Sequence, residues 1–315
     1  RMRRVIIQHT ERGEEMALEA PLFADCTGDG TIGYLAGADY RMGRESEEEF
    51  AEPTAPKQGD AVTMGSSVQW YSTAFPEFSY GVVFNEQNSE KVMMGEWTWE
   101  TGMHKDQIKE FEQIRDYGLL VVYSNWSYLK NRMKENEPYR NRKLAWVAYV
   151  AGKRESRRLL GDYILTENDL RNHIVYEDGT AAATWTIDLH YPDPDNTANF
   201  PGGEFKSIAK HIPIHPYPIP YRCLYSRNVS NLFMAGRDIS VTHVALGTVR
   251  VMRTTGMMGE VVGMAASICT QQGVEPRAVY QHYLPQLKTL MEKGVGKSGL
   301  PNNQQYNEGT TLGEK

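Results

Sequence analysis

Residues 231–240 read Asn-Leu-Phe-Met-Ala-Gly-Arg-Asp-Ile-Ser, and this stretch decides the predicted fold. The apolar run from Leu232 to Ala235 indicates a buried strand, and Gly236 with the polar residues after it predicts a turn. A long helix is expected to follow, from about Val251 to Cys269. We therefore expect an α/β fold in which this strand and this helix belong to one domain.

The expected helix contains three glycines, Gly256, Gly259 and Gly263. Each interior glycine costs about 1 kcal/mol relative to alanine, so their presence needs a compensating reason. Two explanations stay open: close packing of the helix against a sheet, and close approach of the helix to a ligand.

Near the other end of the chain, residues 4–25 have the pattern of two strands, at 5–7 and 20–24, joined by a charged turn at 10–15. Gly28, Gly30 and Gly33 follow. This spacing is typical of a dinucleotide-binding turn, in which backbone amides approach a pyrophosphate. A Rossmann unit also has an acidic residue ending a second strand about 20 residues further on. Residues 45–52 are instead an acidic hydrophilic run with no strand before them. The pattern therefore favours a later turn of a flavoprotein, beside a bound dinucleotide.

The middle of the chain has a different pattern. From Val62 to Trp99 the sequence alternates and is rich in aromatic residues, which indicates antiparallel strands and the start of a second domain. Apolar spacing predicts one or two amphipathic helices in residues 104–134, and a further helix is expected from Tyr139 to Val150. Residues 172–225 return to strand and loop, with 184–188 as the best strand, and the prolines of 212–220 exclude a helix there.

Four ordered blocks resemble an FAD-dependent oxidoreductase family related to the fumarate reductase and succinate dehydrogenase flavoproteins. Residues 24–30 are similar to the family's DATGDG signature, and residues 152–163 are similar to its REsRRivGdY signature. Residues 218–222 resemble iPYRsL, and residues 231–243 resemble NLlvAGRciSaTH, with RVM-like and GqaaG-like patterns at 250–252 and 259–263. The resemblance covers residues 4–290.

This resemblance implies bound FAD in a flavoprotein of the two-dinucleotide-binding-domain type. The FAD is expected to be noncovalent, and a covalent link to a histidine of the upstream segment stays open. Gly236 and Arg237 would form a turn beside the flavin ribityl and pyrophosphate, because glycine lets the backbone come close. Asp238 would hydrogen-bond the ribityl. The earlier turn would pass beside the dinucleotide through Thr27, Gly28, Asp29 and Gly30.

The resemblance also gives the long helix a role. The helix would point its first amides, around Arg253, Thr254 and Thr255, at the pyrimidine edge of the flavin. There the positive end of the helix dipole would stabilise the negative charge of reduced flavin.

Two residues before the expected helix are candidates for catalysis. His243 and Arg250 lie in the expected loop between the last strand and the helix, where both would face a substrate on the isoalloxazine ring. Because histidine changes protonation near neutral pH, His243 is suited to proton transfer. Arg250 resembles in placement the active-site arginine of the fumarate reductase relatives and suits a carboxylate clamp or a proton donor. In the alternative, both residues only cap and brace the helix.

Other polar and aromatic residues are weaker candidates. Asp188 and His190, at the end of an expected strand, fit a role in bracing the fold. A charged cluster is expected on a helix turn, where its ion pairs would fix the two domains together in preference to contacting flavin or substrate: Arg154, Glu155, Arg157 and Arg158. Four tryptophans fit core packing better than a sugar-stacking platform: Trp97, Trp99, Trp126 and Trp146.

The composition, 40% hydrophobic and 23% charged over 315 residues, predicts a soluble globular protein whose partners are small molecules. The net charge of −6 is spread along the chain, which argues against a nucleic-acid surface. No apolar stretch reaches the roughly 20 residues of a membrane-spanning helix. The three cysteines show no metal-ligand spacing, which predicts buried thiols and no metal site.

The chain begins with Arg1 and enters a strand pattern directly. We expect an N-terminal segment of the same polypeptide, with the phosphate-binding glycines, to lie upstream, and we do not expect this chain alone to be active. The compartment stays open, with the cytoplasm favoured over the periplasm, and so does homo-oligomerisation.

These interpretations give an incomplete, Rossmann-like FAD-binding domain from residues 1–45 and 226–295, an inserted mixed α+β substrate domain at 46–225, and a flexible tail at 296–315. The expected reaction is hydride transfer between a small organic substrate and flavin N5. Two other classes stay open: an NAD(P)-dependent dehydrogenase that uses Gly28 to Gly33, and a carbohydrate-binding or structural module without redox activity.

Overall fold

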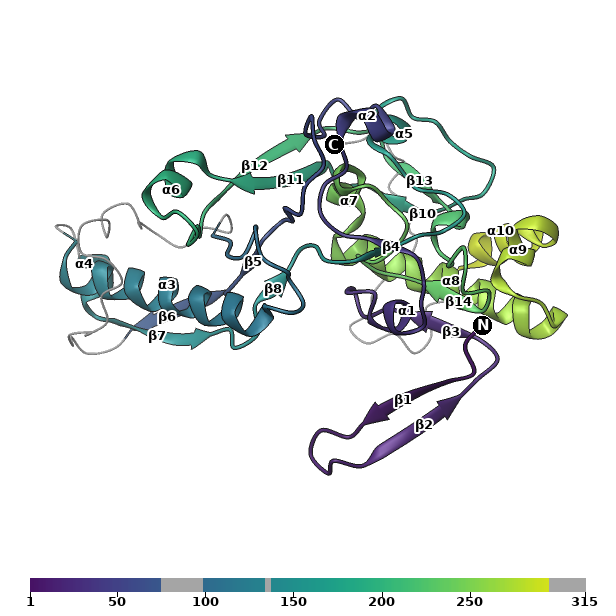
Figure 1. Ribbon diagram of the computed structural model, residues 1–315, viewed down its shortest axis with the longest axis horizontal. Coiled ribbons are helices and arrows are strands. Elements are labelled where there is room, and N and C mark those ends of the chain that lie inside the picture. Colours follow the sequence, from purple (N-terminus) through teal and green to yellow (C-terminus); the bar gives the residue numbers. More distant parts are fainter. Residues whose placement is uncertain (75–98, 134–136, 295–315) are drawn as a thin grey trace. The chain divides into compact units, whose positions relative to one another are not determined.

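A computed structural model describes residues 1–74, 99–133 and 137–294 (Figure 1). The chain forms two compact units: unit 1 is Arg1–Asp60, Ser156–Asp188 and His211–Lys315, and unit 2 is Ala61–Glu155 and Leu189–Lys210. Part of the predicted aromatic segment, including Trp97, and the predicted tail at 296–315 lie outside the described residues.

Unit 1 is built around the strand predicted within residues 231–236. β14 (Leu232–Met234) is buried along its whole length and pairs in parallel with β3 (Phe23–Asp25), so that Met234 lies opposite Asp25. A glycine turn and the short helix α1 (Thr31–Leu35) follow β3. α7 (His243–Val249) and the long helix α8 (Met252–Gln272) follow β14. The predicted buried strand and long helix are confirmed.

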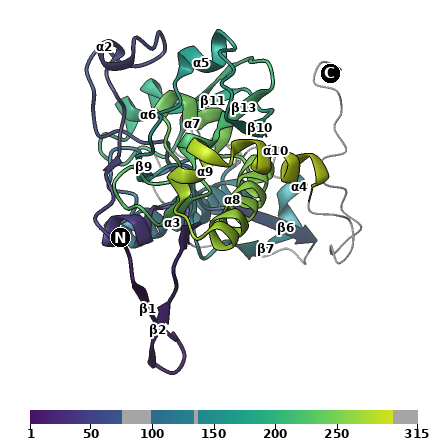
Figure 2. The ribbon, with the colours of Figure 1, turned by 90° about the vertical axis from the view of Figure 1, so that its right-hand side faces the viewer.

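Three elements of unit 1 pack against one side of α8. This helix packs against β10 (Gly179–Ala183), α9 (Pro276–His282) and α10 (Leu284–Lys293), and Figure 2 shows the last two helices beside it. β10 pairs with β13 (Tyr217–Pro220), which lies in the proline-rich passage where no helix was expected. The remaining short elements of unit 1 are β4 (Tyr40–Arg41), β9 (Arg158–Leu159), α2 (Glu47–Phe50), α5 (Glu167–Arg171) and the 3-10 helix η2 (Tyr221–Cys223).

A two-stranded hairpin precedes β3 and extends from it (Figure 1). It consists of β1 (Arg4–Gln8) and β2 (Glu15–Glu19), with Val5 opposite Leu18 and Ile7 opposite Met16. These four apolar side chains share one face because alternate residues of a strand point the same way. The strand predicted at 20–24 therefore differs from the structure. The partner of β1 is β2, which ends at Glu19, and the next strand, β3, starts at Phe23.

Unit 2 contains α3 (Phe111–Asn131), which confirms the amphipathic helix predicted in 104–134. Two antiparallel pairs accompany it: β6 (Trp70–Ala74) with β7 (Arg142–Val147), and β5 (Ser66–Ser67) with β8 (Gly152–Lys153). α4 (Glu137–Arg140) and α6 (Pro194–Asn199) complete its helices among the described residues. β11 (Ile187–Pro192) pairs with β12 (Ser207–Ile212), and a boundary between the two units falls within each of these strands.

The helix predicted at Tyr139–Val150 is wrong, because most of that segment is strand β7. Its side chains pair across to β6, where the rings of Tyr71 and Trp146 stack with centroids 5.8 Å apart. Cross-strand aromatic contacts of this kind outweigh the helix propensity of the segment. The strand predicted at 184–188 starts only at Ile187.

Some of the tryptophans and cysteines that were predicted to be buried are exposed. Trp126 is fully buried and packs edge-on against Trp70, which confirms core packing for that residue, whereas Trp146 is half-exposed. Cys223 and Cys269 are buried as predicted, but Cys26 is exposed because it lies in the turn directly after β3.

The three glycines of α8 lie on an exposed face of the helix. A Cβ atom built on Gly256, Gly259 or Gly263 would meet no described atom within 4 Å. Within residues 1–74, 99–133 and 137–294, close packing of the helix against a sheet therefore does not account for them.

Replacing Gly259 by alanine should raise the free energy of unfolding by about 1 kcal/mol, because alanine gains helix propensity and meets no neighbour. Urea unfolding of the variant and the wild type measures this difference. A destabilised variant would show that another element of the protein covers this face.

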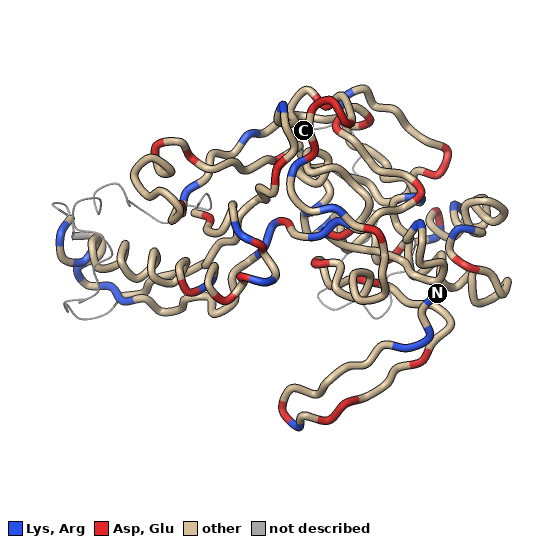
Figure 3. The backbone as a smooth tube through the Cα atoms, in the orientation of Figure 1, with Lys and Arg blue, Asp and Glu red and all other residues tan. Residues whose placement is uncertain are grey.

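Acidic and basic residues are interspersed along the backbone of each unit (Figure 3). No helix in the described part of the chain is both long and apolar enough to cross a bilayer.

Candidate functional site

Two glycine turns meet at the carboxyl ends of β3 and β14, as the sequence predicted. Gly28 and Gly236 both have positive φ, +71° and +147°, a region that side chains other than hydrogen rarely allow. A Cβ atom on Gly236 would lie 3.7 Å from the Cα of Gly28. We call this pair of turns, residues 26–30 and 235–238, the cradle. The cradle lies at the carboxyl ends of two parallel strands, which is where α/β proteins bind ligands.

Asp25 fixes the first turn of the cradle. Its carboxylate accepts hydrogen bonds from the Thr27 amide (3.0 Å), the Thr27 hydroxyl (2.7 Å) and the Gly33 amide (2.8 Å). The Ala235 amide donates to the Asp25 carbonyl oxygen at 3.0 Å and so joins the two turns. The Gly33 amide is therefore already bonded to Asp25 and is not available to a pyrophosphate.

The glycine spacing 28–30–33 does not form a Rossmann phosphate site. The helix behind it, α1, is only five residues long, whereas a phosphate site uses the aligned amides and dipole of a longer helix. Gly33 faces inward instead, where a Cβ atom would lie 2.4 Å from a Leu159 methyl group. This geometry disfavours the NAD(P)-dependent alternative.

Arg237 and Asp29 form the polar rim of the cradle. The Arg237 Nη2 lies 3.5 Å from the Asp29 Oδ1, and the Ser156 hydroxyl donates to the same oxygen at 2.7 Å. A Cβ atom on Gly28 would lie only 2.7 Å from the Arg237 Nη2, so the guanidinium packs directly over that glycine. The arginine is therefore held where it can meet an anion.

Asp238 is fully buried at the inner side of the cradle. Neither of its carboxyl oxygens receives a hydrogen bond from another described residue. Burial raises the pKa of Asp238 well above its usual range, and the neighbouring Asp25 raises it further. A buried carboxyl group without a donor is an unusual feature that a bound ligand would satisfy.

The first turn of α8 is also open. The first amides of a helix have no intrahelical acceptor, and Val251, which precedes α8, offers no capping side chain to take their place. The Thr255 amide is the first that is satisfied, since it donates to the Val251 carbonyl oxygen at 3.1 Å. Thr254 is fully buried and its hydroxyl has no hydrogen-bond partner among the described residues, while Thr255 bonds back to the Met252 carbonyl oxygen at 2.9 Å. Arg253 points to solvent.

His243 and Arg250 are not in a loop, as predicted, but at the two ends of α7. The helix forms because the Thr242 hydroxyl accepts a hydrogen bond from the Ala245 amide and the following residues are buried. The two residues are therefore separated by about 10 Å along the helix axis.

Each end of α7 has its own acidic partner. The His243 amide donates to the Glu45 carboxylate at 2.9 Å. The Arg250 Nη2 donates to the Asp188 carboxylate at 2.9 Å and to the Asp188 carbonyl oxygen at 3.2 Å. Gly247 makes this approach possible, because a Cβ atom there would lie 2.9 Å from the Asp188 backbone nitrogen. Asp188 thus braces Arg250, as the fold-bracing interpretation expects.

A family model described as FAD dependent oxidoreductase matches residues 1–77 and 57–291, which include the cradle, α7 and α8. The chain belongs to this FAD-dependent oxidoreductase family. It is therefore an oxidoreductase of a flavin-using class. This confirms the membership of an FAD-dependent oxidoreductase family that the four sequence blocks indicated. No curated protein and no solved structure matches the chain.

The charged residues predicted on a helix turn, Arg154, Glu155, Arg157 and Arg158, do not lie on a helix. Residues 154–158 run from β8 to β9 as extended chain, because β9 pairs with β4. Arg158 is fully buried and donates to the Glu45 carboxylate (2.8 Å) and the Gly43 carbonyl oxygen (2.7 Å). Arg157 stacks on the Tyr34 ring at 3.8 Å.

Glu52 is a second buried acid, next to Thr242 at the start of α7. It accepts hydrogen bonds from the Thr242 hydroxyl (2.6 Å) and the Glu167 amide (2.7 Å). Burial raises the pKa of Glu52 to about 7, against the effect of these two donors.

Glu52→Gln should change how stability depends on pH. Because the folded-state pKa is raised, the unfolded chain releases this proton at lower pH than the folded chain does. The wild type therefore loses stability relative to the variant as pH rises from about 4.5 to about 7, by up to about 3 kcal/mol, and the difference then stays constant. Urea unfolding across this range measures it. If the free energies of unfolding of the two proteins changed equally with pH, the raised pKa of Glu52 would be contradicted.

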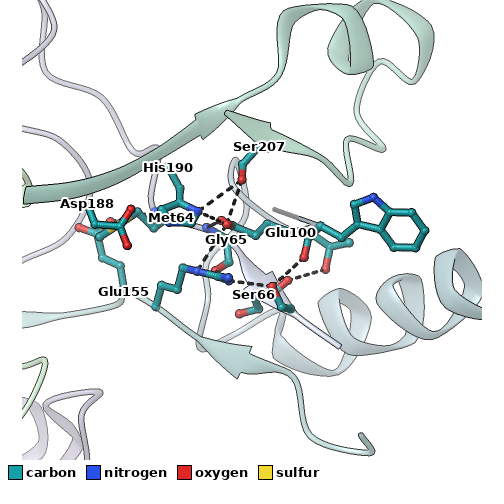
Figure 4. Close-up of polar contacts among 12 residues, drawn as sticks. Met64, Gly65, Ser66, Glu100, Glu155, Asp188, His190 and Ser207 are labelled. Carbon is teal, nitrogen blue, oxygen red and sulfur yellow. Dashed lines mark hydrogen bonds and ion pairs between the residues drawn. The ribbon is translucent and has the colours of Figure 1, made fainter. Parts of the chain in front are cut away.

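Unit 2 contains a polar centre that sequence reasoning missed (Figure 4). The fully buried Glu100 carboxylate accepts hydrogen bonds from the Gly65 amide (3.0 Å) and the Ser207 hydroxyl (2.9 Å), and its Oε1 pairs with the Nδ1 of His190. Arg154 adds its Nε at 3.4 Å. These contacts join β5, β11 and β12, so His190 has the bracing role that was expected for it. The sequence did not indicate Glu100, because it is a single acidic residue after an aromatic stretch and belongs to no recognisable pattern.

No group of three or more His, Cys, Asp or Glu side chains within the described ranges is arranged to hold a metal ion.

Proposed function

We propose that the cradle binds FAD and that the protein transfers a hydride between a small organic substrate and flavin N5. The observation that carries this proposal is the side-by-side placement of Gly28 and Gly236, with the buried carboxyl of Asp238, which receives no hydrogen bond from another described residue, next to Gly236. A Cβ atom would fill the space at either glycine, and a nucleotide would supply the missing partner of Asp238.

The residues present fit the cofactor. Thr27, Gly28, Asp29 and Gly30 would form one wall, and Gly236 and Arg237 the other, with Arg237 meeting the pyrophosphate. The open amides of Arg253 and Thr254 would face negative charge on the ring, whereas the Thr255 amide already donates to the Val251 carbonyl oxygen at 3.1 Å. FAD, when bound, supplies the redox chemistry at N5.

We propose Arg250 and His243 as catalytic residues with separate tasks. Arg250, held by Asp188, would bind an anionic group of the substrate, because a guanidinium pairs with a carboxylate through two parallel hydrogen bonds. His243, at the other end of α7, would move a proton.

The cradle is tested by Gly236→Ala in the complete gene product. The added methyl would lie 2.9 Å from the Asp238 Oδ1 and would need a φ that alanine rarely adopts. We expect this variant to lose FAD on gel filtration while the wild type keeps it. Gly37→Ala is the control, because Gly37 also has a positive φ but a Cβ atom there meets nothing within 4 Å. Equal FAD retention by all three proteins would contradict the proposal.

A further inference from the structure

Two opposite charges lie side by side at the rim of the cradle. The Arg237 guanidinium packs over Gly28, where a Cβ atom would lie 2.7 Å from its Nη2, so it fits there only because residue 28 has no side chain. The Arg237 side chain is 20% exposed and the Asp29 side chain is 18% exposed, so water screens the two charges only partly. An anion that approaches Arg237 at this rim therefore also meets the negative charge of Asp29.

The Asp29 carboxylate has two partners of unequal strength. The Ser156 hydroxyl donates to its Oδ1 at 2.7 Å, a normal length for a hydrogen bond to a carboxylate. The Arg237 Nη2 lies 3.5 Å from the same oxygen, which is longer than the roughly 2.8 Å of a charge-assisted hydrogen bond. Arg237 is therefore the weaker partner of Asp29, whereas Ser156, which is fully buried, holds the carboxylate firmly.

We infer that Arg237 exchanges Asp29 for the pyrophosphate of the nucleotide, so that the charge of Asp29 limits the affinity of the cradle for FAD. Ser156 is a positioning residue, because its hydrogen bond keeps the Asp29 carboxylate from following the guanidinium. Asp29 then remains as a negative charge beside the bound pyrophosphate, and like charges in one partly buried site repel each other. This inference rests on the proposed flavin site and deepens it.

The exchange is tested by calorimetric titration of the complete, flavin-free gene product with FAD. Asp29→Asn removes the charge and should bind FAD about tenfold more tightly than the wild type, with a smaller difference at high salt. Asp39→Asn is the matched control and should bind FAD as the wild type does, because Asp39 also pairs with an arginine, Arg227, but lies outside the cradle. Weaker or unchanged binding of FAD by Asp29→Asn would overturn the inference.

The role of Ser156 is tested by a double-mutant cycle. Ser156→Ala alone should weaken FAD binding several-fold, because the Asp29 carboxylate is then free to stay with Arg237. The same substitution should have little effect in the Asp29→Asn background, where no charge has to be held back. An equal loss of affinity in both backgrounds would show that Ser156 only supports the fold of the turn.

Inorganic pyrophosphate separates a failure of this inference from a failure of the proposed function. It carries the charge of the cofactor's diphosphate without a flavin, so Asp29→Asn should also bind it more tightly than the wild type does. If the wild type takes up pyrophosphate but no FAD, the proposed flavin site is wrong, and the pyrophosphate affinities of the two proteins decide the exchange. If neither protein takes up either ligand, the inference is overturned, because Arg237 then meets no such anion.

Discussion

Replacing Arg250 by alanine should lower kcat/KM for the flavin-dependent reaction by about 10²- to 10³-fold, the usual cost of removing a fixed charge that meets the substrate in the transition state. Arg250 is suited to this task because Asp188 and the close approach at Gly247 hold its guanidinium in one place. Steady-state kinetics of the complete gene product, with a carboxylate substrate found by anaerobic flavin bleaching, measure the effect.

Two further variants separate this role from bracing. Arg250→Lys keeps the charge but loses the planar fork, so it should recover only part of the activity. Arg12→Ala removes a cation from the exposed turn of the hairpin and should leave kinetics unchanged. If Arg250→Ala lowers the melting temperature but not kcat/KM, Arg250 only braces the end of α7.

Replacing Arg158 by methionine should lower the free energy of unfolding by about 3–5 kcal/mol, because it leaves the Glu45 carboxylate buried without its closest cation. Arg158 has no exposed surface, so its loss also removes the donor to the Gly43 carbonyl oxygen. Urea unfolding monitored by circular dichroism measures this loss.

The matched control is Arg227→Met. Arg227 also pairs with an acid, Asp39, but both side chains are more than 40% exposed, so its loss should cost under about 1 kcal/mol. Adding Glu45→Gln to Arg158→Met should restore part of the stability, because the orphaned charge is then gone. Equal effects of Arg158→Met and Arg227→Met would mean that burial of the ion pair has no consequence.

The sequence predicted the elements whose signal is local. The apolar run 232–235, between Asn231 and Gly236, is enough to predict β14, and the spacing of apolar residues is enough to predict α3 and α8. The pairing of β14 with β3 joins residues about two hundred positions apart, and only the resemblance to a flavoprotein family indicated it.

Other features depend on contacts that no local pattern reports. Residues 142–147 form a strand because β6 offers a partner, against their own propensity. Residues 243–249 form a helix although Gly247 weakens it, because Gly247 allows α7 to approach Asp188. The close approach of the Gly236 turn to Gly28 likewise arises only when β3 and β14 pair.

The most direct test of the flavin site is the visible absorption spectrum of the complete gene product, purified from its native source without added cofactor. The cradle predicts the two absorption bands of an oxidised flavin, with about one FAD per chain released on denaturation. A colourless protein that stays colourless after incubation with FAD would contradict the account.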